Sequence, residues 1–221
     1  MLDTETPSND EPTVPPATLT SVRAIGFEGV LDHVKADCGQ ARADLDRYYR
    51  TYTGRHFETF SAASDPWRFD GNDLAACAAL SVPISHATLD ALWSNVDALD
   101  RRLARCPPPE VDLTTVDPSS GEYRQLEKLY DDIRAIPGMG YVRTSKLLAS
   151  KRPRLVPIRD SYLEAFLGSP TGWWSAWREL VRTPGLVELV EQHTPPVAAH
   201  ASILRRLDVV CWMAVERQLA K

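Results

Sequence analysis

The sequence lacks the features that mark several large classes of protein. Its four cysteines, Cys38, Cys77, Cys106 and Cys211, lie far apart, so no Cys-x-x-Cys pair is present for a zinc site or an iron–sulfur cluster. The histidines show no metal-ligand spacing either, and we expect no metal and no other cofactor. No apolar run approaches the roughly 20 residues of a membrane span, and no signal peptide opens the chain. We therefore expect a cytoplasmic protein with free thiols and no membrane association.

Motifs of the common enzyme classes are also absent. The chain has no Gly-x-Ser-x-Gly nucleophile turn, no phosphate-binding loop and no dinucleotide fingerprint, so hydrolase and kinase functions have no support. Its formal net charge is -5 over 221 residues. A chain with this charge has no overall attraction for nucleic acid, so any nucleic-acid binding must come from a local basic patch.

The chain does contain a succession of amphipathic helical patterns. Residues 1–18 are acidic and proline-rich with few large apolar groups, which predicts a disordered tail. From about residue 27 apolar side chains recur at three- and four-residue steps, and the longest helical patterns cover about 27–52, 87–105 and 197–219. We find no convincing strand. We predict an all-α fold, a helical bundle forming a single domain over residues 19–221, with two helical lobes as the alternative arrangement.

A short turn separates two of these helical patterns. It reads Ile136-Pro137-Gly138-Met139-Gly140, and it predicts a helix-hairpin-helix over residues 122–150. Proline fixes the backbone at the entry, and glycines permit a positive φ and a close approach of another backbone. The amides at the start of the second helix form an anion site, and a DNA phosphate is the natural ligand because amides hold phosphate without reading sequence.

Basic residues follow this turn with no acidic residue between them. They are Arg143, Lys146, Lys151, Arg152, Arg154 and Arg159. We predict that double-stranded DNA is the partner and that its backbone is bound by Pro137, Gly138, Met139, Gly140, Arg143, Lys146, Lys151, Arg152 and Arg154. The alternative is a plain αα-hairpin with a solvated basic surface.

The segment from Ile136 to Asp160 resembles the signature of the helix-hairpin-helix DNA glycosylase superfamily. That signature reads Leu-Pro-Gly-Val-Gly, then a helix, a connector with a proline, and a catalytic aspartate that opens the next helix. In several members the aspartate lies 20 residues beyond the second glycine. Here Asp160 lies 160 − 140 = 20 positions after Gly140, and Pro157 falls in the connector. The resemblance covers about residues 120–168.

The resemblance implies a role for Asp160. Its carboxylate would stabilise the positive charge that develops on the sugar as a base leaves, or would position the attacking water, once the base has been turned out of the duplex. Val142 occupies the position of the nucleophilic lysine of bifunctional members, so the resemblance implies a monofunctional DNA N-glycosylase. Two alternatives stay open: Asp160 is an ordinary helix N-cap, and the chain is a non-catalytic docking module that keeps the hairpin.

A second resemblance covers more of the chain. An uncharacterised bacterial family, a domain of unknown function, is similar to this sequence over roughly residues 48–216. The similar segments are Tyr52–Glu58, Asp73–Ala76, Leu80–Pro83, Ser145–Ala149, Lys151–Pro153 and Leu204–Val210. This family implies no activity and so does not decide between the hypotheses.

Two aromatic clusters have a structural and a functional interpretation. Trp173, Trp174 and Trp177 could form a base-stacking platform, but packing of their helix against the last helix through Trp212 is favoured. The aromatic residues of segment 48–56 could line a nucleic-acid groove, but the amphipathic end of a helix is favoured there.

Overall fold

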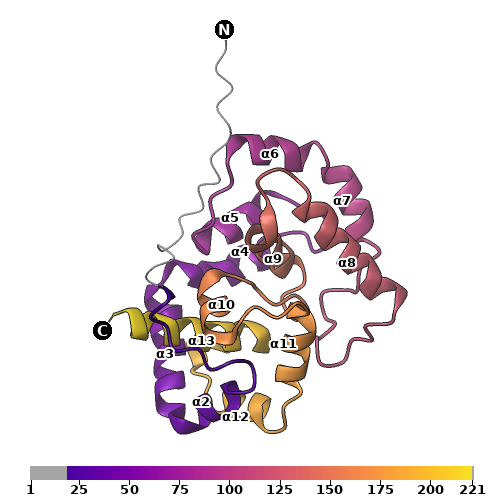
Figure 1. Ribbon diagram of the computed structural model, residues 1–221. Helices are drawn as coiled ribbons and strands as arrows, with labels where there is room; N and C mark the ends of the chain where they lie inside the picture. Colours follow the sequence, from indigo (N-terminus) through magenta and orange to yellow (C-terminus); the bar gives the residue numbers. More distant parts are fainter. Residues whose placement is uncertain (1–18, 221) are drawn as a thin grey trace.

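Every regular element in the described part of the chain is helical. The computed structural model describes residues 19–220, and within that range the chain forms α-helices, short 3₁₀ helices and loops, without a strand (Figure 1). The all-α prediction is therefore confirmed. The predicted disordered tail over residues 1–18 lies outside the described residues. None of the described helices combines the length and the apolar character that a membrane crossing requires.

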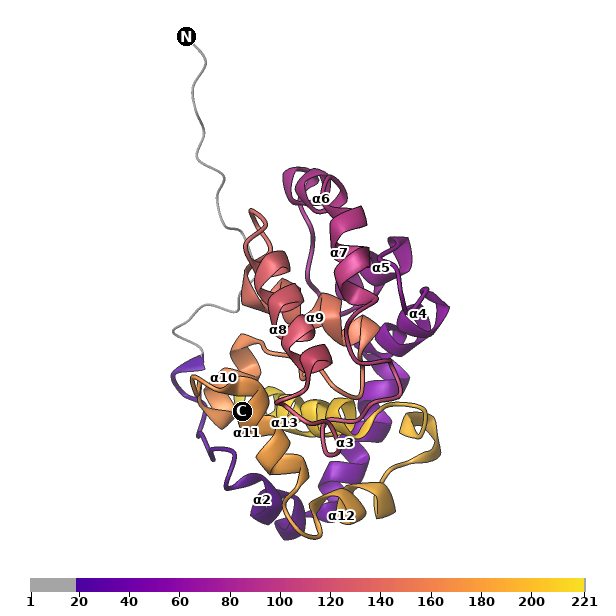
Figure 2. The same ribbon diagram turned by 90° about the vertical axis from the view of Figure 1, so that its right-hand side faces the viewer.

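Six helices from the middle of the chain form one group, in the upper half of Figure 1. They are α4 (Phe57–Ala63), α5 (Gly71–Ala79), α6 (His86–Trp93), α7 (Val96–Leu103), α8 (Gly121–Arg134) and α9 (Gly140–Lys151). Helix α9 packs against α4, α5 and α8, and α7 packs along α8 (Figure 2). Because α9 has neighbours on several sides, it is buried from Val142 to Lys151.

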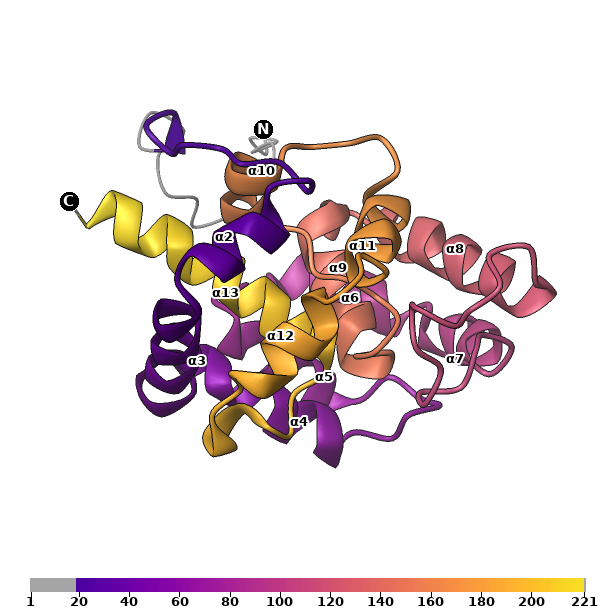
Figure 3. The ribbon, with the colours of Figure 1, turned by 90° about the horizontal axis from the view of Figure 1, so that it is seen from below.

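Helices from both ends of the chain form the other group. They are α2 (Val30–Ala36), α3 (Cys38–Thr51), α10 (Ser161–Leu167), α11 (Trp173–Val181), α12 (Leu186–Gln192) and α13 (Ile203–Leu219). Helix α13 is the centre of this group and packs against α3, α10 and α12 (Figure 3). The 3₁₀ helix η1 (Thr53–His56) leads from α3 into the upper group, and η2 (Pro196–Ala198) precedes α13.

Several long helical patterns are broken in the structure. The pattern over 27–52 divides at Asp37, whose Oδ1 accepts a hydrogen bond from the Gln40 amide at 2.8 Å and so starts α3. The pattern over 87–105 divides between α6 and α7. There the Ser94 hydroxyl and the side-chain Nδ2 of Asn95 donate to main-chain carbonyls four residues earlier. These side-chain bonds compete with the main-chain hydrogen bonds of a continuous helix. Caps and local side-chain hydrogen bonds therefore set helix lengths that apolar periodicity alone overestimates.

Candidate functional site

The turn between α8 and α9 has the backbone that its glycines predict. Gly138 and Gly140 have φ values of +82° and +53°, in the left-handed region that favours glycine. A Cβ atom on Gly138 would overlap the hydroxyl of Thr88 in α6. Pro137, Gly138 and Gly140 are exposed, Met139 is fully buried, and no side chain caps the first turn of α9. The turn is thus anchored on one side and open to solvent on the other.

The basic residues after the turn do not form the exposed surface that the sequence predicts. Exposed fractions are 9% for Arg143, 6% for Lys146, 1% for Lys151 and 0% for Arg152. Arg143 donates to the carbonyl oxygens of Gly138 at 2.8 Å and Pro83 at 3.0 Å. The alternative of a solvated basic surface therefore does not hold at these four positions, because each cation has acceptors inside the protein. Arg154 is exposed, and Arg159 pairs with Glu164 at 2.7 Å.

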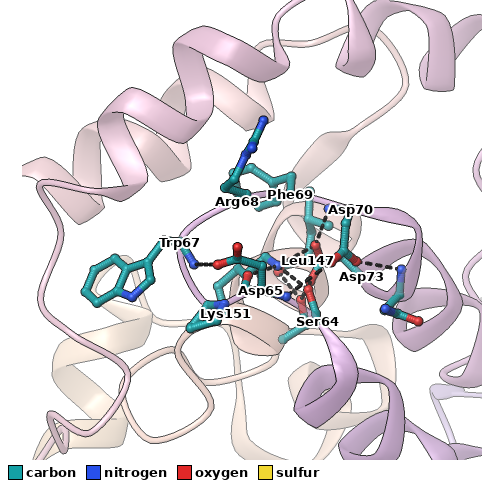
Figure 4. A network of polar contacts seen from close by, with 12 residues as sticks. Ser64, Asp65, Trp67, Arg68, Phe69, Asp70, Asp73, Leu147 and Lys151 are labelled. Atoms are coloured by element: carbon teal, nitrogen blue, oxygen red, sulfur yellow. Dashed lines mark hydrogen bonds and ion pairs between the residues drawn. The ribbon is translucent and has the colours of Figure 1, made fainter.

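Lys151 lies at the centre of a buried polar network (Figure 4). Its Nζ is 2.6 Å from Asp73 Oδ2, and both side chains are completely buried. It also donates to the carbonyl oxygen of Asp65 at 2.7 Å and to the Ser64 hydroxyl. Asp73 in turn closes the capping box of α5 with Asp70. The C-terminal end of α9 is thereby fastened to the loop between α4 and α5.

The neighbouring Arg152 fastens the same end of α9 to other loops. Its guanidinium donates to the carbonyl oxygens of Pro66 at 2.8 Å and of Pro107, and it lies over the ring of Trp67, 5.0 Å from the centroid. Burial lowers the pKa of Arg152 from its usual value. These contacts give Arg152 a structural role.

Asp160 precedes α10 and has two sets of contacts. Its Oδ1 accepts a hydrogen bond from the Leu163 amide at 3.1 Å, so it is the N-cap of α10. Its Oδ2 lies 3.7 Å from Lys146 Nζ, which also donates to the carbonyl oxygen of Leu80 at 3.3 Å. Asp160 also lines a cavity, and so does Lys146. The interpretation of Asp160 as a helix N-cap is therefore correct. The same side chain also lines the cavity.

This cavity, which we call the aromatic cavity, has a volume of about 360 Å³. Its lining comes from both helix groups: the end of α3 and the segment after it, residues 79–82, α9, the start of α10, and α13. Five aromatic residues line it: Tyr48, Tyr52, Tyr141, Tyr162 and Trp212. The cavity thus lies where the two groups of helices meet, with Asp160 in its wall.

Four of these rings are arranged in two stacked pairs. Tyr48 and Tyr52 have centroids 5.5 Å apart at an interplanar angle of 8°, and Tyr162 and Trp212 lie 5.2 Å apart at 16°. Trp212 also meets Tyr52 edge-on at 5.5 Å. The segment with Tyr48 and Tyr52 is the amphipathic end of α3, as favoured from the sequence, and it also lines a cavity.

Trp212 is also not the partner of the Trp-rich helix α11. Trp173 and Trp177 are buried, as the packing interpretation predicts, but they meet Phe27, at 5.4 Å and 5.9 Å. Trp174 packs edge-on against two tyrosines of α8. The prediction that the tryptophans of α11 pack inside the protein is thus confirmed, but the prediction that Trp212 is their partner is wrong.

A buried charged cluster completes the wall of the aromatic cavity. Arg205 in α13 donates to Asp208 and to the Tyr48 hydroxyl, and its Nε lies 3.2 Å from Glu58 Oε1. Burial raises the pKa of Asp208 to about 6, and the charge of Asp160 acts in the same direction. Within the described residues, no three His, Cys, Asp or Glu side chains are placed to hold a metal ion.

The sequence assigns no role to Arg205 or Asp208. The second resemblance is the signal that could have found them, because four of its segments contribute residues to the aromatic cavity. These segments are Tyr52–Glu58, Leu80–Pro83, Ser145–Ala149 and Leu204–Val210. Glu58 does not line this cavity, but it pairs with Arg205, which does. Comparison with known proteins agrees with that resemblance: the model of a family described as "Family of unknown function (DUF6308)" matches residues 41–215. No curated protein and no solved structure matches the chain.

Proposed function

Since the chain belongs to DUF6308, a family of unknown function, its activity has to be inferred from its geometry, and we propose that it is a DNA-binding protein of the helix-hairpin-helix glycosylase type. It would draw a damaged or modified base into the aromatic cavity and hydrolyse the N-glycosidic bond without a covalent intermediate. The observation that carries this proposal is the carboxylate of Asp160 in the wall of a cavity lined by five aromatic side chains.

The cavity suits a nucleobase in size and in chemistry. Its volume of about 360 Å³ falls within the range of roughly 300–1,000 Å³ typical of ligand pockets. A base that leaves the stack loses contacts with its neighbours, and stacking on an aromatic side chain recovers about 1–3 kcal/mol. The paired rings of Tyr48, Tyr52, Tyr162 and Trp212 offer such contacts next to Asp160.

The chemistry assigned to Asp160 is electrostatic. As the bond between C1′ and the base nitrogen breaks, positive charge develops on the sugar, and a carboxylate held in place stabilises it. The base leaves with the electrons of the bond. Water then adds to C1′, and its proton passes to the carboxylate and from there to the departed base. The Leu163 amide holds one oxygen of Asp160, and the ammonium of Lys146 lies beside the other. We assign Lys146 a positioning role, in place of the phosphate contact inferred from the sequence.

The hairpin supports DNA binding, but through fewer residues than the sequence predicts. Pro137, Gly138 and Gly140 are exposed next to uncapped amides at the start of α9, which suits a backbone phosphate. Arg143, Lys146, Lys151 and Arg152 are buried, so they add no phosphate contacts unless the structure changes. We therefore assign backbone binding to the hairpin alone.

The experiment is an excision assay with a panel of duplexes. Each duplex carries one deaminated, alkylated or oxidised base, and abasic sites are detected by alkaline cleavage. We expect the protein to generate abasic sites in at least one duplex. If it generates none in any duplex while binding them, base excision is wrong.

A pair of variants tests the cavity in the same assay. Tyr52→Leu removes one ring of the cavity, and about 1–3 kcal/mol of stacking corresponds to a loss of roughly 5- to 150-fold in kcat/KM. Trp93→Leu is the matched control, because Trp93 in α6 is exposed and does not line the cavity. Equal effects of the two substitutions would show that the base does not enter there.

One observation favours the second candidate, a non-catalytic docking module. Asp160 already serves α10 as its N-cap, which is a sufficient structural reason for an aspartate at that position. This candidate predicts DNA binding that depends on the hairpin, without abasic sites in any duplex.

A further inference from the structure

A second cavity lies beside the aromatic cavity, and the proposed function does not use it. It has a volume of about 420 Å³ and is bordered by α4, the loop after α9 and the N-terminal part of α13. Ile158, Arg205 and Asp208 line both cavities, so these residues form a shared wall. We call this second site the arginine cavity, after Arg154 and Arg206 in its lining.

The charges that line the arginine cavity are not balanced. Its two carboxylates, Glu58 and Asp208, are both engaged by Arg205, and Lys151 is engaged by Asp73. Arg154 and Arg206 form no ion pair with any carboxylate of the described residues within 4.0 Å. Arg154 is exposed, and Arg206 is half-buried. The cavity therefore presents two positive charges whose counter-charges do not come from the described chain.

Arg206 also has unused hydrogen-bonding capacity. One terminal nitrogen donates to the carbonyl oxygen of Ala199 at 2.7 Å, but its Nε is buried and has no hydrogen-bond partner. The Ser61 hydroxyl, in another wall of the cavity, is likewise buried without a partner, and so is the carboxylate oxygen Oε2 of Glu58. Buried donors in this state are costly, and a ligand oxygen reached by a small side-chain movement would satisfy them.

Apolar side chains from several loops and helices form another part of the lining. Phe57, Pro109, Pro153, Val156 and Leu204 contribute to it. An inorganic anion would leave these side chains unused, whereas a ligand with a hydrocarbon body would bury apolar surface against them.

We propose that the arginine cavity binds a small organic anion, a phosphate or carboxylate group carried on an apolar body. The anionic group pairs with Arg154 and Arg206, because a guanidinium matches the oxygens of phosphate and carboxylate. The apolar body lies against the walls around Phe57 and Leu204. This site is independent of base excision.

The test uses the full chain and phenyl phosphate as the probe, measured by isothermal titration calorimetry. Phenyl phosphate combines both features, while inorganic phosphate and phenol each carry one. We expect saturable 1:1 binding of phenyl phosphate that is at least tenfold tighter than binding of either simpler probe. Saturable binding of inorganic phosphate alone with equal affinity would overturn the proposal.

Variants locate the binding. Arg154→Gln should weaken phenyl phosphate binding at least fivefold, and adding Arg206→Gln should weaken it further. Arg134→Gln in α8 is the matched control, because Arg134 is exposed and does not line the cavity. Arg154 is exposed, so its substitution tests the proposal even if the Arg206 variant does not fold. The proposal is overturned if Arg154→Gln changes the affinity no more than the control does, or if duplex DNA displaces phenyl phosphate, which would indicate a backbone contact.

Discussion

The buried pair Lys151–Asp73 allows a quantitative prediction about stability. Lys151→Met removes an ammonium that lies 2.6 Å from Asp73 Oδ2, with neither side chain exposed. Removing one partner of such a pair costs about 3–5 kcal/mol, because the remaining charge is buried without its counter-charge. Asp73 keeps hydrogen bonds from Ser64, Ser150 and the Asp70 amide, so we expect the lower end, about 3 kcal/mol. Chemical denaturation followed by circular dichroism measures this loss.

Two further variants make this prediction decisive. Lys128→Met in α8 replaces an exposed lysine by the same residue and should stay within about 0.5 kcal/mol of the wild type. Lys151→Met combined with Asp73→Asn leaves no unpaired charge and should recover part of the loss. If Lys151→Met costs less than about 1 kcal/mol but weakens DNA binding, the reasoning is refuted, and Lys151 is the exposed phosphate contact that the sequence predicts.

Three more predictions follow from the hairpin and the cavities. Gly140→Ala should destabilise the protein by roughly 1–2 kcal/mol, because the glycine has a positive φ. Gly138→Ala should cost more, because a Cβ on this glycine would also overlap Thr88, and thermal melts of the two variants measure the difference. The slope of the logarithm of DNA affinity against the logarithm of salt should be shallower than about −1 if only the hairpin amides hold phosphate, because uncharged amides release few counterions. The five cations predicted to bind DNA would give a slope of about −4 to −5 if they were exposed, and fluorescence anisotropy distinguishes the two. Burial raises the pKa of Asp208 to about 6 from 3.8, so folding takes up a proton between these pH values. The resulting stability is present at low pH and lost as pH rises through about 6, and urea midpoints should show this fall in the wild type but not in Asp208→Asn.

The local features of the fold could be predicted from the sequence because their causes are local. Asp70 and Ser85 cap the helices that follow them, since a short polar side chain satisfies amides two or three residues away. The glycines of the hairpin adopt the positive φ that their spacing indicates. Burial of Trp173 and Trp177 also follows from the pattern of their own helix.

Features that depend on distant residues could not be predicted in this way. Lys151 is buried by acceptors from residues 64–73, some 80 positions earlier, and nothing in its own segment distinguishes a paired cation from a solvated one. The aromatic cavity likewise combines Tyr52, Tyr162 and Trp212 from three separate parts of the chain. Periodicity reveals which face of a helix is apolar but not which distant side chains complete a site.

The central claim is that Asp160 acts on a base held in the aromatic cavity, and single-turnover excision at saturating protein tests it most directly. Asp160→Asn keeps a residue that caps a helix well, so α10 should persist while the negative charge is lost. Asp131→Asn, at an exposed position of α8, is the matched control. With the duplex that the wild type processes, we predict unchanged DNA affinity for both variants and loss of abasic-site formation by at least a hundredfold for Asp160→Asn alone. Excision by Asp160→Asn at the rate of the control would contradict the account.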